Sequence, residues 1–446
     1  MKIFIEGGYL ITQEKVFKEG GVLIEDNLIV EAGDLKEVKK SVGRGFERIR
    51  ANGKMIIPGL INTHTHISMT LFRGYADDYP LQEWLEKWIW PIEAKLKPED
   101  IEIGAMLGAL ESIRMGVTTI CTLYHYHPDH NEASGLLRIG LRGVVGIAVF
   151  TWQKDENIRN IKNALSRWHG RDGLIRVAVG PHAPYTVDPD LWIELSELRR
   201  WADEKYGDSG RVIITTHVAE DPNEAKITSE RFNVKIPNGS LFKYLDNLGV
   251  LNEYFLAAHA IHLSNDDIKA IKDNNVKISH NPISNMKLGM GISPIYKLIN
   301  EGIIVGLGTD GPASNNTLDI FETMKITSLL QKVITGDPTS IPARTAFKMA
   351  TIYGAKALSY SGIGDIKPGY LADITIINLS NPHLIPIYDP ISHLVYCIRS
   401  LDVDTVIING EIKYHEGKFI GIDVNSVYEK VNKSVSRLLS EVSDIG

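Results

Sequence analysis

Eight short apolar runs, most of them separated by helical patterns, constrain this chain more than any other feature of its sequence. Between residues 58 and 365 they repeat a strand–helix unit, which matches a (β/α)8 barrel of about 250 residues with insertions. A doubly wound open sheet shows the same alternation and is the alternative at this point. The runs are residues 59–61, 119–121, 144–147, 177–179, 212–214, 255–257, 276–278 and 303–305.

Both ends of the chain instead carry β-hairpin patterns. Apolar triplets at 22–24 and 28–30 flank an Asp-Asn pair, and strands at 406–408 and 411–414 meet across Asn409-Gly410, a strong two-residue turn signal. We therefore expect one small β-sandwich domain formed from both chain ends. Its parts are residues 1–57 and 366–446, and the metal-dependent barrel of residues 58–365 lies between them.

The last part of the chain predicts an amphipathic helix. Val424, Val427, Val431, Val435, Leu438 and Val442 recur at steps of three and four. We expect a cap near Asn425 or Ser426 and packing of the apolar side against the body of the protein.

Composition excludes several classes of protein. The 48 Lys and Arg against 55 Asp and Glu give a net charge of −7, which argues against nucleic-acid and membrane-surface partners because both are polyanions. Only 2 cysteines occur, so neither a disulfide scaffold nor a cysteine-rich zinc module is expected. The sequence shows no signal peptide and no membrane-spanning run, which favours a cytoplasmic location.

Metal-ligating side chains follow six of the eight apolar runs. Because chemistry in a (β/α)8 barrel gathers at the carboxyl ends of the strands, these side chains are expected to converge. A single histidine of this kind is usually a hydrogen-bonded core residue, but convergence at so many strand ends is hard to explain by packing alone. The residues are His64 and His66, His182, His217 with Glu220, His259 and His262, His280, and Asp310.

Four of these residues suit one metal centre. Alternate residues of a strand point the same way, so His64 and His66 can present two imidazoles to one point. His217 and Asp310 would complete the set. Three nitrogens with one carboxylate suit a single Zn²⁺ ion, and Fe²⁺ is also compatible.

Such a centre predicts hydrolysis. A divalent ion with an open position lowers the pKa of bound water towards neutrality and so supplies a hydroxide that attacks the substrate. Glu220 is placed to protonate a ring nitrogen of the substrate, Asp310 to take the proton of the water, and His259 to orient the attacking oxygen.

Three weaker patterns have plainer interpretations. His125 and His127, next to Pro128, predict a polar loop rather than a second metal site. The glycines of residues 306–311 resemble a dinucleotide fingerprint but follow the last strand, and a tight turn that aims Asp310 explains them better. The Ser-x-x-Lys match at residues 284–287 is a weak sign of a serine acyl hydrolase.

Four segments together resemble the amidohydrolase superfamily: PGLINTHTH at 58–66, THVAE at 216–220, SHNP at 279–282 and GTDG at 308–311. Two more, MTLFRG at 69–74 and WPIE at 90–93, resemble the branch of 5′-methylthioadenosine/S-adenosylhomocysteine deaminases and triazine chlorohydrolases. The resemblance covers essentially the whole chain. A binuclear amidase of this superfamily would need a lysine or glutamate at the end of the fourth strand, where residues 179–182 have neither.

The resemblance implies a hydrolytic deaminase acting on an adenine nucleoside or a related amino-heterocycle, releasing ammonia. It implies His64, His66, His217 and Asp310 as metal ligands, Glu220 and His259 as catalytic partners, and a homo-oligomer. Glu93 and His182 match positions that hold the ribose, although an ion pair of Glu93 with Lys95 or Lys97 is the plainer interpretation. The alternatives are a chlorohydrolase of a triazine-like ring and a deaminase of a free base such as guanine or cytosine.

One position departs from that branch. Its members tend to carry an arginine at the end of the third strand, where this chain aligns Ile147. Lys154 or Arg159 could replace that cation from the following loop, and an apolar residue equally suits a substrate without a carboxylate tail. The sequence therefore favours methylthioadenosine over S-adenosylhomocysteine.

Overall fold

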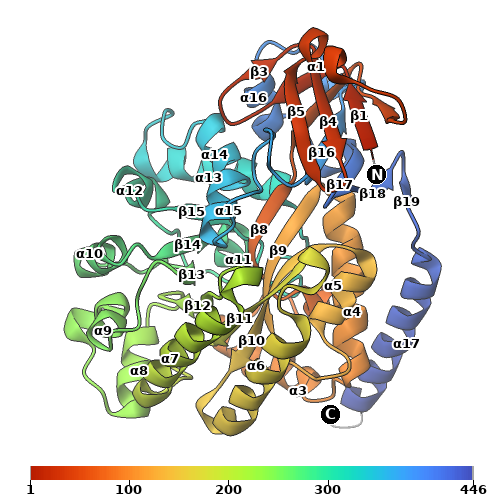
Figure 1. Ribbon diagram of the computed structural model, residues 1–446. Helices are drawn as coiled ribbons and strands as arrows, with labels where there is room; N and C mark the ends of the chain where they lie inside the picture. Colours follow the sequence, from red (N-terminus) through yellow and green to blue (C-terminus); the bar gives the residue numbers. More distant parts are fainter. Residues whose placement is uncertain (1, 444–446) are drawn as a thin grey trace.

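A parallel eight-stranded sheet forms the centre of the computed structural model, which describes residues 2–443 (Figure 1). The strands follow one another in chain order from β8 to β15, and each overlaps one of the predicted apolar runs. They are β8 (Leu60–Thr65), β9 (Val117–Tyr124), β10 (Arg142–Val149), β11 (Ile175–Pro181), β12 (Ile214–Val218), β13 (Phe255–His259), β14 (Lys277–His280) and β15 (Val305–Leu307).

Hydrogen bonds between the first and last strands close this sheet into a barrel. The backbone N–H groups of Thr309 and Asp310, just after β15, donate to the carbonyl of His64 at 3.1 and 3.0 Å. A Cβ on Gly306 would lie 2.5 Å from Thr63 Cγ2, so glycine is needed for the close approach of β15 to β8. The sequence-based expectation that the glycines of residues 306–311 form a tight turn is wrong. Asp310 itself takes the left-handed backbone, with φ of 61°.

Helices follow the strands and surround the barrel, as the periodicity predicted. Several begin with a side-chain cap; Asp188, for example, accepts from Leu191 N at 2.9 Å. The helices are α4 (Pro98–Arg114), α5 (Glu132–Ile139), α6 (Lys154–Trp168), α7 (Pro189–Tyr206), α8 (Glu224–Phe232), α9 (Leu241–Asn247), α10 (Asn265–Asp273), α11 (Pro282–Lys287), α12 (Ile295–Asn300), α13 (Ile320–Thr335), α14 (Ala343–Met349) and α15 (Ile352–Ala357).

Strands from both chain ends form two further sheets, shown in red and blue beside the barrel in Figure 1. One has the order β5-β4-β1-β6 and the other β19-β18-β17-β16-β7-β2-β3, and buried isoleucines such as Ile3 and Ile376 fill the space between them. The strands are β1 (Lys2–Glu6), β2 (Tyr9–Ile11), β3 (Val16–Phe17), β4 (Gly20–Glu25), β5 (Leu28–Asp34), β6 (Glu47–Arg50), β7 (Lys54–Pro58), β16 (Ile374–Asn378), β17 (Val403–Ile408), β18 (Glu411–His415) and β19 (Lys418–Phe419).

Both predicted hairpins are present. β4 pairs with β5, and β17 pairs with β18 across Asn409 and Gly410, whose φ values of 52° and 78° are those of the predicted turn. Helices α1 (Leu35–Ser41) and α16 (Pro390–Tyr396) complete this part of the chain.

The C-terminal helix, α17 (Val424–Ser443), lies along α4 (Figure 1). Its cap is Asp423, whose carboxylate accepts from Ser426 N at 3.1 Å, so the expected cap at Asn425 or Ser426 is wrong by two or three residues. Leu438 is buried against Phe72 and other residues of the barrel mouth. Among the described residues, no helix is both long and apolar enough to cross a membrane.

One long connection, from β8 to α4, lies over the mouth of the barrel. It holds η1 (Ile67–Phe72), α2 (Leu81–Glu83), the π-helix η2 (Trp84–Ile89) and α3 (Trp90–Glu93). An ion pair between Asp77 and Lys287 of α11 ties this connection to the helix that follows β14. We call residues 73–96 the mouth segment.

Candidate active site

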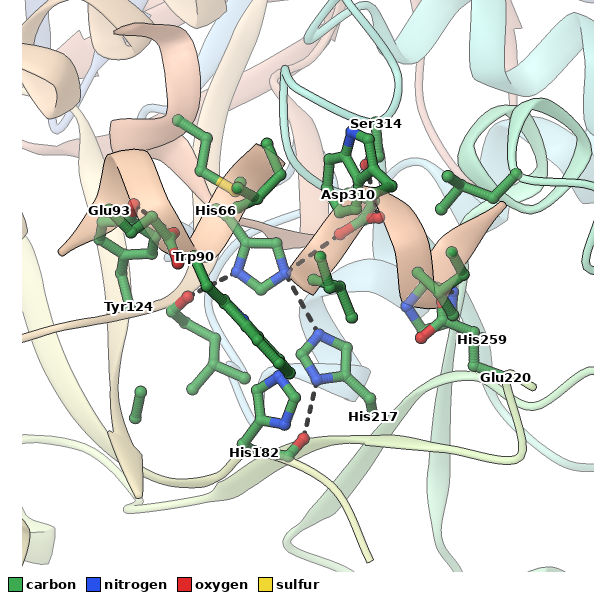
Figure 2. Close-up of a pocket in the computed structure, with 18 of the residues that line it drawn as sticks. His66, Trp90, Glu93, Tyr124, His182, His217, Glu220, His259, Asp310 and Ser314 are labelled. Atoms are coloured by element: carbon green, nitrogen blue, oxygen red, sulfur yellow. Dashed lines mark hydrogen bonds and ion pairs between the residues drawn. The ribbon is translucent and has the colours of Figure 1, made fainter. Parts of the chain in front are cut away.

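Side chains from β8, β12 and the loop after β15 meet at the carboxyl ends of the strands (Figure 2). The Nε2 atoms of His64 and His66 lie 3.4 and 3.2 Å from Asp310 Oδ1. The Nε2 atoms of His66 and His217 lie 3.2 Å apart. The structure therefore brings together all four residues that the sequence predicts as metal ligands. We call His64, His66, His217 and Asp310 the metal-ligand set.

The hydrogen bonds around these imidazoles fit a bound cation. Nδ1 of His66 lies 2.6 Å from the carbonyl of Leu123, and Nδ1 of His217 lies 2.7 Å from that of His182, so each Nδ1–H donates outward. The Nε2 lone pairs of both rings then face each other and the carboxylate, an arrangement that a divalent ion stabilises. Within the described residues, Asp310 Oδ1 and both ring nitrogens of His64 are buried without a hydrogen-bond partner.

His259 lies close enough to belong to the same group. One ligand atom each from His64, His217, His259 and Asp310 lies within 4.8 Å of the others. The Nδ1 atom of His259 is 2.8 Å from Asn285 Oδ1 and 3.6 Å from the carboxylate of Glu220. These contacts place His259 between the metal-ligand set and Glu220, where it can orient a polar group.

The backbone at the site is unusual for residues with side chains. Ala219, His259 and Asp310 have φ values of 58°, 71° and 61°. Left-handed backbone costs free energy in residues other than glycine and concentrates at functional sites. Here it directs the last residues of several strands into the barrel mouth.

The second oxygen of Asp310 is held by two hydroxyl groups. Ser284 Oγ and Ser314 Oγ donate to Oδ2 at 2.6 and 2.7 Å. Lys287, three residues after Ser284, contacts Asp77 and Asn316 instead. Ser284 is therefore a partner of Asp310, and the Ser-x-x-Lys match does not form a serine nucleophile with an adjacent lysine base.

Burial keeps several of these imidazoles neutral at pH 7, the form in which they bind metals. It lowers the pKa of His64 to about 4 and of His182 to about 3, and holds that of His217 well below its usual value. Burial also raises the pKa of Asp310, but the imidazoles of His64 and His66 close to its carboxylate outweigh burial and hold the pKa well below the usual range.

Glu220 lies in the same pocket with most of its carboxyl shielded from water. Burial raises its pKa, which favours the protonated form that can donate a proton. Its backbone N–H donates to the Glu224 carboxylate at 2.9 Å, which fixes the turn between β12 and α8.

Glu93 of the mouth segment and His182 after β11 line this pocket together (Figure 2). Tyr124 donates to Glu93 Oε1 at 2.6 Å, and His125 Nε2 lies 4.0 Å from Oε2. Among the described residues, the Glu93 carboxylate contacts these two groups and neither Lys95 nor Lys97. Glu93 therefore faces the pocket, and it does not form the surface ion pair with Lys95 or Lys97 that was the plainer expectation.

The pocket, which we call the inner pocket, has two walls. Strand ends and their loops give the polar wall, and the mouth segment gives an apolar wall. The polar wall includes His66, Tyr124, His125, His182, His217, Glu220, His259 and Asp310, and the apolar wall includes Leu81, Trp84, Leu85, Ile89 and Trp90.

Four residues differ from the sequence-based interpretation or were missed by it. His125 lies in the predicted loop but also lines the inner pocket, and only its position after a strand could have indicated this. Lys154, a candidate substrate cation, pairs with Glu194 at 2.6 Å. Neither Lys154 nor Arg159 lines the inner pocket, and His280 is fully buried and does not line it either.

Comparison with known proteins agrees with this geometry. The model of the amidohydrolase family matches residues 55–413, which include the barrel and every residue of the metal-ligand set. The chain belongs to the amidohydrolase family. This amidohydrolase is accordingly a hydrolase that acts on carbon–nitrogen bonds, and the resemblance seen in its motifs is confirmed.

Curated relatives of this amidohydrolase span nearly the whole chain. It is 42% identical to a 5′-deoxyadenosine deaminase of Methanothermobacter thermautotrophicus over 93% of both chains. It is also 42% identical to a 5-methylthioadenosine/S-adenosylhomocysteine deaminase of Thermococcus kodakarensis, over 92% of this chain and 94% of the relative.

Solved structures share the fold. A zinc-bound adenosine deaminase from Xanthomonas campestris matches with a TM-score of 0.89 and 29% identity, covering 98% of each chain. An atrazine chlorohydrolase from Arthrobacter aurescens matches with a TM-score of 0.86 and 22% identity, covering 97% of this chain and all of the other. At that identity the second match shows the fold alone.

Proposed function

We propose that this amidohydrolase is a metal-dependent deaminase of adenine nucleosides, and that its single divalent ion is zinc. The observation that carries the proposal is the inner pocket, which places the metal-ligand set beside a shielded Glu220 and a pocket-facing Glu93. The curated relatives named as deaminases of 5′-deoxyadenosine and of methylthioadenosine/S-adenosylhomocysteine support the substrate class. The zinc in the adenosine deaminase structure supports the metal.

His64, His66, His217 and Asp310 would hold the ion, which when bound supplies Lewis acidity and a nucleophile at neutral pH. Each residue near it then has a distinct task. Glu220 donates a proton to the purine ring nitrogen next to the amino-bearing carbon. Asp310 accepts the proton of the attacking water.

His259 orients the attacking oxygen, and its hydrogen bond with Asn285 fixes the ring in place. Glu93 accepts hydrogen bonds from the ribose hydroxyls, and the imidazole of His182 completes the ribose contacts. The proton held by Asp310 then passes to the amino group, which leaves as ammonia when the carbon–nitrogen bond breaks, and Glu220 takes the proton of the new hydroxyl, so that the base becomes an oxo-purine. The apolar wall of the mouth segment limits the access of water to the reacting base.

A panel of substrates tests the proposal directly. The purified protein is incubated with adenosine, 5′-deoxyadenosine, 5′-methylthioadenosine, S-adenosylhomocysteine, guanine, cytosine and a chlorotriazine, and released ammonia and chloride are measured. We expect ammonia from the adenine nucleosides. Chloride release from the triazine, or ammonia from the free bases alone, would contradict the proposal and favour one of the other activities of this fold.

Metal analysis tests the cofactor. We expect one equivalent of zinc per chain, loss of deamination on chelation, and recovery when zinc is returned. Two equivalents per chain would indicate a binuclear hydrolase instead. The domain boundaries after residues 57 and 365, a homo-oligomeric assembly and a cytoplasmic location stay predictions.

A further inference from the structure

A second cavity of about 580 Å³ opens next to the inner pocket, and we call it the outer chamber. Trp90, Glu93, His125, Ala148 and Phe150 line both spaces, so the two cavities share a wall. The metal-ligand set lies only on the side of the inner pocket. A nucleoside whose base faces that set and whose ribose reaches Glu93 therefore points its remaining end toward the outer chamber.

A row of neighbouring rings runs from the metal-ligand set into this chamber. The ring centres of His217 and His182 lie 5.0 Å apart, those of His182 and Phe150 4.9 Å, and those of Phe150 and Trp152 4.8 Å. The last two pairs are stacked, with interplanar angles of 28° and 30°. Trp152 ends the row at the surface, where 62% of the residue is exposed.

The backbone that carries Phe150 and Trp152 is fixed rather than free. Phe150 N donates to Asn157 Oδ1 at 3.0 Å, and Thr151 N donates to the carbonyl of Thr186 at 3.1 Å. Thr186 Oγ1 in turn lies 3.0 Å from His182 Nδ1. The turn η3 (Thr151–Gln153) thus holds an exposed tryptophan in one place, which favours a binding role because ordering a bound group then costs less entropy.

The charges of the chamber disfavour anions. Among the described residues, its lining has the carboxylates of Glu93 and Glu156 against one guanidinium, that of Arg231, and it also includes the imidazoles of His125 and His127. Arg231 already donates from Nη1 to the carbonyl of Tyr185 at 3.0 Å. Ile147, where the related branch tends to have an arginine, adds an apolar surface. A phosphate or a carboxylate tail would meet more negative than positive charge here.

We propose that the outer chamber binds the 5′ substituent of the nucleoside, and that the Phe150–Trp152 pair selects uncharged thioether and alkyl substituents. The inference rests on the proposed nucleoside deamination and adds the part of the substrate that the inner pocket does not contact. Thioether sulfur and methyl groups pack well against aromatic rings. Trp152 lines the outer chamber and not the inner pocket, so it is a specificity residue with no part in the chemical step.

Trp152→Ala tests the inference through a ratio of substrates. We expect kcat/KM for 5′-methylthioadenosine to fall about tenfold relative to that for 5′-deoxyadenosine, which lacks the larger substituent. The change is expected in KM with little change in kcat, because the contact is equal in the ground and transition states. Trp152→Phe keeps an aromatic ring and should recover most of the ratio.

Trp201→Ala is the matched control, since Trp201 is an exposed tryptophan of α7 that lines neither cavity, and it should leave the ratio unchanged. Wild-type protein should also prefer 5′-methylthioadenosine to S-adenosylhomocysteine and to adenosine 5′-monophosphate. An unchanged ratio in Trp152→Ala, or a preference for either charged substrate, overturns this inference while leaving nucleoside deamination intact. Absence of turnover with every adenine nucleoside overturns the proposed function and this inference together.

Discussion

Replacement of Glu220 by glutamine probes the proton donor while changing little else. Glutamine has the shape of glutamate but cannot give up a proton to the ring nitrogen of the substrate. The Glu220 side chain is only 13% exposed, so water cannot easily take over its role. Its carboxylate lies 3.6 Å from Nδ1 of His259, and it does not belong to the metal-ligand set.

The expected loss follows from the contribution of a positioned general acid, which is about 10²- to 10⁴-fold in rate. We expect kcat to fall about 10³-fold, equivalent to about 4 kcal/mol in activation free energy. KM should change little, because Glu93 and His182, the proposed ribose contacts, are left in place in the pocket. Metal content should stay at the wild-type level, because the four ligands are untouched.

The assay combines ammonia release under steady-state conditions with metal analysis of the same preparation. Glu230→Gln is the matched control, because Glu230 lies on α8 with a 68% exposed side chain. The activity of this variant should equal that of the wild type. A Glu220→Gln variant that retains more than a tenth of wild-type kcat would refute the assignment. Loss of activity together with loss of metal would show that Glu220 acts on the metal site instead.

Three further predictions concern the metal, the contact between the chain ends and the barrel, and pH. Asp310→Ala removes the carboxylate 3.2 Å from His66 Nε2 and should lower both metal content and turnover below a tenth; full metal occupancy, measured by elemental analysis, would contradict this. Asp373→Ala removes the carboxylate that lies 2.7 Å from the buried guanidinium of Arg142 and so leaves this charge without a counter-charge. The change should lower the free energy of unfolding by about 3–5 kcal/mol. Denaturant unfolding measures that cost, and it should greatly exceed the effect of Glu25→Ala, which removes an exposed pair. Burial raises the pKa of Glu132 from 4.5 to about 7, so between these pH values the folded state binds more protons than the unfolded state. The free energy of unfolding should therefore fall by roughly 3 kcal/mol as the pH rises from 4.5 to about 7. In Glu132→Gln this component should be absent, and identical pH profiles of melting temperature for the two proteins would argue against the shift.

Much of the fold was predictable because its signals are local. Each of the eight apolar runs overlaps a barrel strand, and the Asn409-Gly410 turn lies where the sequence placed it. Local signals also have local errors. The strands at residues 214–218 and 305–307 begin two residues later than their apolar runs, and the cap of α17 lies at Asp423.

Much of the candidate site was predictable because residues such as His217 and Asp310 lie at the carboxyl end of a strand or within three residues of it. It was not predictable where a residue reaches the pocket from a long connection. Nothing in the sequence near Trp90 or Trp152 shows that these side chains line cavities beside the metal-ligand set. Their placement depends on how the mouth segment and η3 fold over the barrel, which involves contacts between distant residues.

The sequence by itself determined the strand–helix order, the hairpins at both ends and the residue types at the strand ends, because these depend on periodicity and turn chemistry within short windows. Only the tertiary structure decided that the sheet closes, through hydrogen bonds between residues that are some 245 positions apart, Thr309 and Asp310 with His64. It also decided that Arg142 of the barrel meets Asp373 of the chain end, and that a tryptophan on the surface extends the row of rings behind His217. Such pairings are selected by burial and closure over the whole chain, and no local pattern records them.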